Sequence, residues 1–159
     1  MKRKVEMKPG RACAGAGGSK TPRTGFEISL INTRDRRLAA VAVELGRLLA
    51  REFPHARGAQ ACVVFTDDAT ITALNRRYRH RNVPTDVLSF PMRHPDPDTG
   101  RRTLGEVYIA RARAREQGRE FRTGYYGELR RLILHGLLHL LGLSHREMRA
   151  VDRKLEGNG

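Results

Sequence analysis

Three histidines within eleven residues are the part of the sequence with the clearest chemistry. His135 and His139 are four residues apart in a segment with a helical apolar pattern, so both imidazoles project from the same helix face. Gly142 follows His139 by three residues and can adopt the left-handed conformation that ends a helix, which lets the chain bring His145 back toward the pair. Three imidazoles with an open fourth position are a ligand set of catalytic zinc sites.

A lone pair of histidines at this spacing is usually structural or exposed. Here, however, the flanking residues are Leu and Ile, so we expect the imidazoles to be buried, and buried imidazoles without partners are costly. Three imidazoles also suit zinc better than magnesium. We therefore predict one zinc ion, Zn(2+), bound by His135, His139 and His145.

Gly136 limits the chemistry of this site. The spacing follows the zinc-peptidase pattern H-E-x-x-H-x-x-G-x-x-H, but Gly136 stands where that pattern has its glutamate. In a peptidase the glutamate is the general base, so a metalloprotease is the weakest interpretation. What remains is a metal that activates water or organises a phosphodiester, for which RNA carries its own nucleophile, the 2′-hydroxyl.

A second candidate site is a cluster of four arginines within six residues, Arg76, Arg77, Arg79 and Arg81, where a predicted helix ends. Arginine makes paired contacts with phosphate, and the neighbouring Tyr78 could stack on a base. The alternative is that these arginines only complement the helix dipole. Thr85 and Asp86 are expected to fix the turn that follows.

The net charge agrees with a polyanionic partner. The 159 residues carry a formal charge of +14, and 26 of the 31 basic residues are arginine. We interpret residues 1–24, with +6, as a disordered basic tail, which leaves +8 on a single domain over 25–159. No apolar run is long enough to span a bilayer, so no membrane partner is expected. Cys13 and Cys62 are interpreted as reduced thiols of a cytoplasmic protein.

The apolar patterns predict an α+β fold, a small mixed sheet of about four strands packed with four to five helices and a zincin-like metal helix. Pro91 indicates that its strand lies at a sheet edge, because proline cannot donate to a neighbouring strand. Strands are predicted over 26–31, 60–66, 86–92 and 105–110, and helices near 34–53, 68–78, 111–119, 125–141 and 145–156.

Two of these segments together resemble a known family. They are Pro84-Thr-Asp-Val-Leu-Ser-Phe-Pro91 and the histidine segment with glycine in the glutamate position, and Leu104-Gly-Glu106 is similar too. The chain resembles the YbeY family of bacterial endoribonucleases and rRNA maturation factors over roughly residues 26–156. Before the third histidine, that family usually has aspartate where this chain has Ser144, so the resemblance supplies no carboxylate there.

The resemblance implies a metal-dependent, single-strand-specific endoribonuclease that acts near the 3′ end of small-subunit rRNA and in ribosome quality control. It implies zinc on the three histidines, with His135 and Arg79 as the catalytic residues and Arg79 in a positive cleft facing the metal. The implied partners are single-stranded RNA, rRNA, the small ribosomal subunit and the GTPase Era. A non-catalytic ribosome assembly factor with a structural metal accounts for the charge and for Gly136 equally well.

Overall fold

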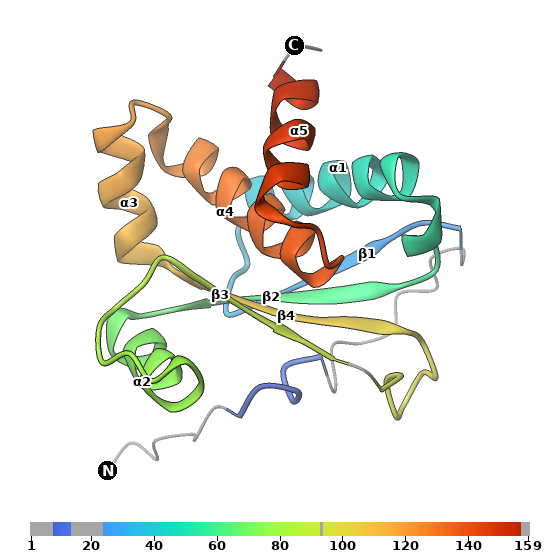
Figure 1. Cartoon of the computed structure of the whole chain (residues 1–159), viewed down its shortest axis with the longest axis horizontal. Helices are drawn as coiled ribbons and strands as arrows, with labels where there is room; N and C mark the ends of the chain where they lie inside the picture. Colours follow the sequence, from blue (N-terminus) through green and yellow to red (C-terminus); the bar gives the residue numbers. More distant parts are fainter. Residues whose placement is uncertain (1–7, 14–23, 93, 157–159) are drawn as a thin grey trace.

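A computed structural model of the chain describes residues 8–13, 24–92 and 94–156. In this part of the chain, four strands form one sheet in the order β1-β2-β4-β3 (Figure 1). The first three strands in this order are parallel, and β3 is antiparallel to β4 at one edge, so the predicted mixed sheet is confirmed. The strands are β1 (Glu27–Ile31), β2 (Gln60–Thr66), β3 (Val87–Pro91) and β4 (Thr103–Ala110).

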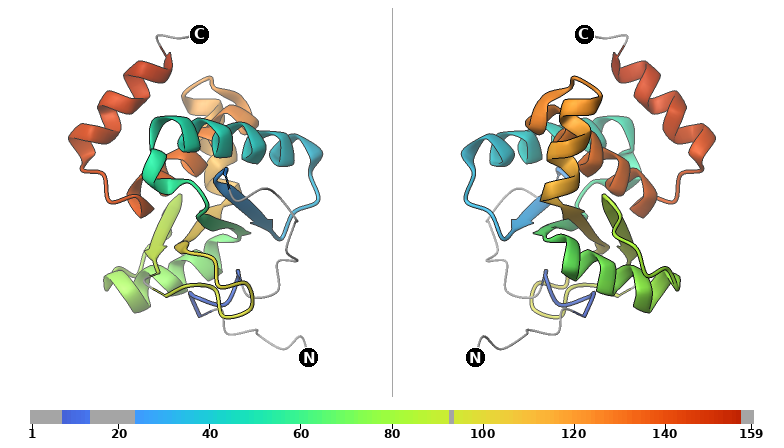
Figure 2. Two further views of the ribbon diagram at one scale, coloured as in Figure 1. Left: turned by 90° about the vertical axis from the view of Figure 1, so that its right-hand side faces the viewer. Right: turned by 90° about the vertical axis from the view of Figure 1, so that its left-hand side faces the viewer.

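Helices cover both faces of this sheet, as the two side views show (Figure 2). Helices α1, α3, α4 and α5 lie on one face, and α2 lies on the other. The α+β class is therefore confirmed. The helices are α1 (Arg36–Glu52), α2 (Asp68–Arg79), α3 (Arg111–Glu120), α4 (Gly124–Leu140) and α5 (His145–Glu156), with a short 3-10 turn, η1, over Pro54–Ala56.

Local chemistry sets the bounds of these elements. The carboxylate of Asp67 accepts a hydrogen bond of 2.7 Å from the backbone N–H of Thr70 and so caps α2, and Asp35 caps α1 in the same way. Helix α1 ends before Pro54, which cannot continue it. Pro91 lies in the edge strand β3, as its missing N–H predicts.

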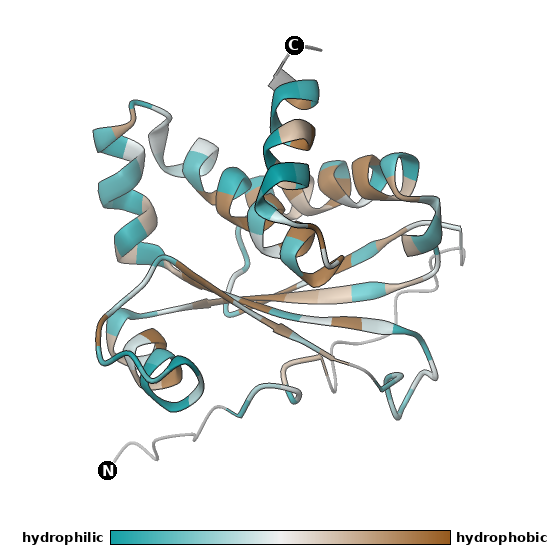
Figure 3. Ribbon diagram, viewed as in Figure 1, coloured by the Kyte–Doolittle hydropathy of each residue, from teal (hydrophilic) through white to brown (hydrophobic). Residues whose placement is uncertain are grey.

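The alternation of side chains along β4 divides the interior into two cores. Val107 and Ile109 pack against the side of α1 and α4, whereas Tyr108 and Ala110 pack against α2. The hydropathy colouring shows the apolar residues along the sheet and on the helix sides that face it (Figure 3). Because β2 and β4 are covered on both faces, their sequences are nearly continuous apolar runs.

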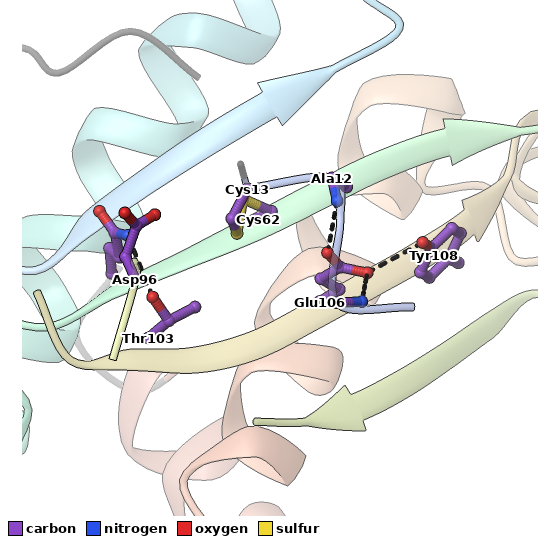
Figure 4. Close-up of a disulfide and its surroundings, with 9 residues drawn as sticks. Ala12, Cys13, Cys62, Asp96, Thr103, Glu106 and Tyr108 are labelled. Atoms are coloured by element: carbon purple, nitrogen blue, oxygen red, sulfur yellow. Dashed lines mark hydrogen bonds between the residues drawn. A yellow bond between two sulfur atoms is a disulfide. The ribbon is translucent and has the colours of Figure 1, made fainter. Parts of the chain in front are cut away.

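A short segment near the N-terminus corrects one expectation. Cys13 and Cys62 form a disulfide, so the prediction of two reduced thiols is wrong (Figure 4). The segment 8–13 lies against the sheet, because the backbone N–H groups of Gly10 and Ala12 donate to the buried Glu106 carboxylate at 2.9 and 2.7 Å. The remainder of the expected tail, 1–7 and 14–23, lies outside the described residues.

Across the described ranges, none of the helices combines the length and the apolar character needed to cross a bilayer.

Candidate active site

Helix α4 places His135 and His139 side by side, one turn apart. Both side chains are half-buried, and their Nε2 atoms are 3.1 Å apart. Burial lowers the pKa of His135, and the positive charge of Arg131 lowers it further. Burial also lowers the pKa of His139, with added effects from the other two histidines and Arg79. Both imidazoles are therefore neutral near pH 7 and keep a lone pair, as metal ligands or proton acceptors require.

The turn after α4 brings the third histidine to this pair, as predicted. Gly142 has a φ of +79°, the left-handed conformation that ends the helix, and its N–H donates to the carbonyl of His139 at 3.0 Å. His145 is the first residue of α5, and its ring meets that of His139 edge-on with 5.4 Å between centroids. The side chain of His145 is exposed, so packing does not hold its imidazole in place.

Ser144 has a structural role at the start of helix α5. The backbone N–H of Ser144 donates to Glu147 at 2.6 Å, and the N–H of Glu147 donates to the Ser144 hydroxyl at 3.3 Å. This reciprocal pair is a capping box at the start of α5. The same contacts lower the pKa of Glu147. Ser144 therefore fixes the helix that begins with His145 and supplies no carboxylate.

The donor set matches zinc chemistry, although the nitrogens do not yet surround one point. Zinc–nitrogen bonds near 2.1 Å at tetrahedral angles put two ligand nitrogens about 3.4 Å apart, compared with the 3.1 Å between His135 and His139. Within the described ranges, no group of three or more His, Cys, Asp or Glu side chains is arranged to hold a metal ion. His145 is the most exposed of the three histidines, and its ring centroid lies 5.4 Å from that of His139.

Gly136 lies where α4 packs closely against the sheet. A Cβ atom at this position would lie 2.4 Å from Cγ1 of Val107 and 3.0 Å from its Cγ2. The buried hydroxyl of Ser89 donates to the carbonyl of Gly136 at 3.1 Å, which joins β3 to α4. No side chain fits here without displacing the helix, so a peptidase glutamate is sterically excluded in this arrangement.

A cavity of about 720 Å³ lies between the end of α2, the segment that follows it and α4. Its lining includes Arg79 and Arg81 together with His135 and His139, so it joins the two candidate sites of the sequence. Arg79 is exposed and reaches the carbonyl of Ser89 through a long contact of 3.4 Å.

The other members of the basic cluster and the third histidine lie outside this lining. Arg76, Arg77 and His145 are not among the residues that line the cavity. Tyr78 is also absent from the lining; 39% of its surface is exposed, and its ring meets that of Phe90 edge-on with 5.2 Å between centroids.

Two residues of this cavity were not assigned a site role from the sequence. Asp86 lines it, and its carboxylate accepts from Gln117 at 3.1 Å and from the N–H of Val87 at 2.8 Å. Its negative charge raises the pKa of His135, opposing the effect of burial. The buried Asn75 donates to the carbonyl of Val83 at 2.8 Å and so holds the turn after Arg79. The sequence signalled Asp86 only as a turn residue.

Comparisons with known proteins fit this geometry. The family model described as "Endoribonuclease YbeY" matches residues 26–156. The chain belongs to the YbeY endoribonuclease family. The match contains every histidine and arginine discussed above and leaves residues 1–25 outside.

Individual family members show the same extent of similarity. The protein named endoribonuclease YbeY of Aquifex aeolicus is 35% identical over 125 residues, 79% of this chain and 82% of that protein. The protein of the same name from Thermodesulfovibrio yellowstonii is 32% identical over 136 residues, which cover 81% of this chain and 79% of that protein. The match to the Persephonella marina protein is 45% identical but spans about half of each chain. The solution structure of TM1509 from Thermotoga maritima has a TM-score of 0.56 and 27% identity, covering 81% of this chain and 85% of that one.

Proposed function

We propose that this chain is a metal-dependent, single-strand-specific endoribonuclease that acts in rRNA maturation. The observation that carries the proposal is the cavity that brings two arginines from the end of α2 together with the histidine pair of α4. The relatives are named endoribonucleases, and they match the chain across this whole region. A phosphodiester is the substrate that uses both halves of the site, because its charge suits arginine and its cleavage suits a neutral imidazole or a bound metal.

Arg79 and His135 are assigned the catalytic roles. Arg79 binds the scissile phosphate: it is exposed, and its single long contact to Ser89 leaves most of the guanidinium fork for a ligand. His135 lines the same cavity, and its lowered pKa keeps the imidazole neutral near pH 7, so its lone pair is available to hold the proposed metal ion beside that phosphate.

Zinc is the proposed cofactor, held by His135, His139 and His145. The support is the donor type, the neutral state of the two half-buried imidazoles and the 3.1 Å between their Nε2 atoms. A zinc ion bound there supplies Lewis-acid polarisation beside the phosphate that Arg79 holds.

Preference for single strands is supported by an aromatic side chain at the end of α2. Tyr78 offers a partly exposed ring next to Arg79, and an unpaired base can stack on such a ring. A base-paired nucleotide has its faces already stacked and cannot use this contact.

The cellular part of the proposal follows from the family resemblance. We assign the activity to the domain over 25–159, in the cytoplasm, on rRNA of the small ribosomal subunit near its 3′ end and in ribosome quality control. The GTPase Era is the proposed protein partner. Cytoplasmic location implies that the Cys13–Cys62 disulfide is exposed to reducing conditions.

The test uses the full chain loaded with zinc and an end-labelled RNA, offered as a single strand and as the same strand in a duplex. We expect cleavage of the single strand, lowered on the order of 10²-fold by Arg79→Gln and by His139→Gln. Arg119→Gln is the matched control, since Arg119 is exposed on α3 and outside the cavity. Equal cleavage by all four proteins would show that the activity comes from a contaminant.

A non-catalytic assembly factor with a structural metal is the second candidate, because the basic charge and Gly136 in place of a glutamate fit it equally well. It predicts that Arg79→Gln loses RNA binding and that no protein cleaves RNA. It also predicts that His139→Gln, if folded, still supports rRNA maturation.

A further inference from the structure

Besides Arg79 and Arg81, a further arginine, Arg131, lies on the same face of α4 as the histidine pair. Arg131, His135 and His139 are spaced by four residues along α4, so their side chains form one row. Arg131 precedes His135 by one turn, about 6 Å along the helix axis. The positive charge of Arg131 lowers the pKa of His135. Arg131 does not line the cavity that contains Arg79, so the site described above gives it no role.

The guanidinium of Arg131 is held in a fixed position. Its Nε donates to Glu128 Oε1 at 3.0 Å, and its Nη2 donates to the same oxygen. The Glu128 side chain is fully buried, whereas that of Arg131 is 49% exposed. Among the described residues Nη1 has no hydrogen-bond partner. An arginine fixed on one edge by a buried carboxylate and open on the other is prepared to bind an anion, because little rotamer entropy is lost on binding.

Arg131 lines a second cavity, of about 400 Å³, between α4 and α5. His135 lines this cavity as well as the one that contains Arg79. The two cavities therefore share His135 as a lining residue, and one contains Arg79 whereas the other contains Arg131. The remaining charged groups of the second cavity are Arg130, which is paired with Glu44 on α1, and Asp152 on α5.

We propose that the RNA strand runs across α4 from the first cavity into the second, and that Arg131 binds a phosphate on the far side of His135 from Arg79. This proposal rests on the endoribonuclease function proposed above and assigns a substrate path to it. The hydrogen bonds to Glu128 raise the pKa of the Arg131 guanidinium, and the charges of Asp86 and Asp152 add smaller effects in the same direction. Glu128 is a positioning residue that acts through Arg131.

Binding of a short single-stranded 2′-O-methyl RNA, which lacks the 2′-hydroxyl, tests the path. Because Arg131→Gln alone leaves Glu128 buried and unpaired, the test variant is the double substitution Arg131→Gln with Glu128→Gln, which stays neutral as a pair. We expect binding about tenfold weaker than wild type. The slope of log Kd against log salt should fall by about 0.7, one phosphate contact on a single strand. The KM for cleavage should rise while kcat changes little.

Two further variants make the result specific. Arg131→Lys keeps the charge and the ion pair, so it should weaken binding without changing the salt slope. Arg119→Gln removes one exposed charge away from both cavities and should change neither value by more than a small fraction of the test variant's effect.

The outcomes separate the two proposals. If the double variant binds as Arg119→Gln does while Arg79→Gln loses cleavage, the endoribonuclease stands and the strand path is wrong. If the wild type neither binds nor cleaves single-stranded RNA, the proposed function itself fails. Circular dichroism of each variant shows that it is folded, and Arg131→Lys carries the test if the double variant is not.

Discussion

Replacing Gly136 by alanine is the sharpest test of how α4 is seated on the sheet. The new Cβ would lie 2.4 Å from Val107 Cγ1, about 1 Å inside ordinary contact, and 3.3 Å from the Ser89 hydroxyl. Val107 is fully buried and β-branched, so it cannot rotate away cheaply. Overpacking of this kind costs up to about 3 kcal/mol. Alanine regains about 1 kcal/mol of helix propensity, which leaves a net loss of about 2 kcal/mol.

Gly127 provides the matched control in the same helix. It is exposed, and a Cβ there would meet only the Thr123 Cβ at an ordinary 3.5 Å. Gly127→Ala should therefore raise the free energy of unfolding by about 0.5–1 kcal/mol. Urea denaturation at pH 7 measures both variants, and the difference of about 3 kcal/mol between them isolates the steric clash.

A double-mutant cycle with Val107→Ala completes this test. Removing both γ-carbons makes room for the new methyl group, so the double variant should be more stable than the sum of the two single losses by at least 1 kcal/mol. Cleavage should follow stability, because a displaced α4 moves His135 relative to Arg79. Strict additivity, or a Gly136→Ala protein as stable as Gly127→Ala, would refute the packing argument.

Three further measurements address other parts of the fold. Ser144→Ala should lose about 1 kcal/mol through loss of the α5 cap, whereas Ser144→Asp should melt like wild type; equal melting of both variants would contradict the capping role. Cys13→Ser should lower the free energy of unfolding by about 4 kcal/mol, the loop-closure value for cysteines 49 residues apart. Dithiothreitol should lower the free energy of unfolding of the wild type by the same amount and should not change that of the variant. The Tyr126 hydroxyl and the Arg37 N–H lower the pKa of Asp35. The stabilising contribution of Asp35 is therefore present above pH 3.8, its ordinary pKa, and is lost as the pH falls through the lowered pKa. Tyr126→Phe should raise the pKa of Asp35, which an NMR titration measures. An unchanged pKa would exclude the contact between Tyr126 and Asp35.

The local sequence pattern was sufficient to predict the helices, the strands and the turn at Gly142 that follows His139. The β-branched run at 60–66 and the apolar helix near 125–141 were recognisable because burial imposes its period on the sequence. Pro91 and Gly142 marked an edge and a turn because their backbone chemistry allows little else. These features depend on neighbours a few residues away.

Features that depend on distant segments could not be predicted in this way. Cys13 meets Cys62 because backbone N–H groups of a segment without periodicity bind Glu106, a contact that spans more than ninety residues. The sequence showed that Gly136 stands in place of a glutamate, but the reason is the approach of Val107 from β4. Arg131 could be placed on the histidine face, yet its cavity exists only once α5 is placed against α4.

Helix α4 contains nine buried residues on the sides that face the core, and the histidine pair projects from the remaining side. Elements with such burial belong to the cooperative unit whose amide protons exchange last, when the whole domain opens. We therefore expect the amide protons around the histidine pair to be among the slowest to exchange in the described part of the chain. His145, on an exposed helix end, belongs to a region that can open alone. Any adjustment of the site without global unfolding must come through the turn at Gly142 and α5.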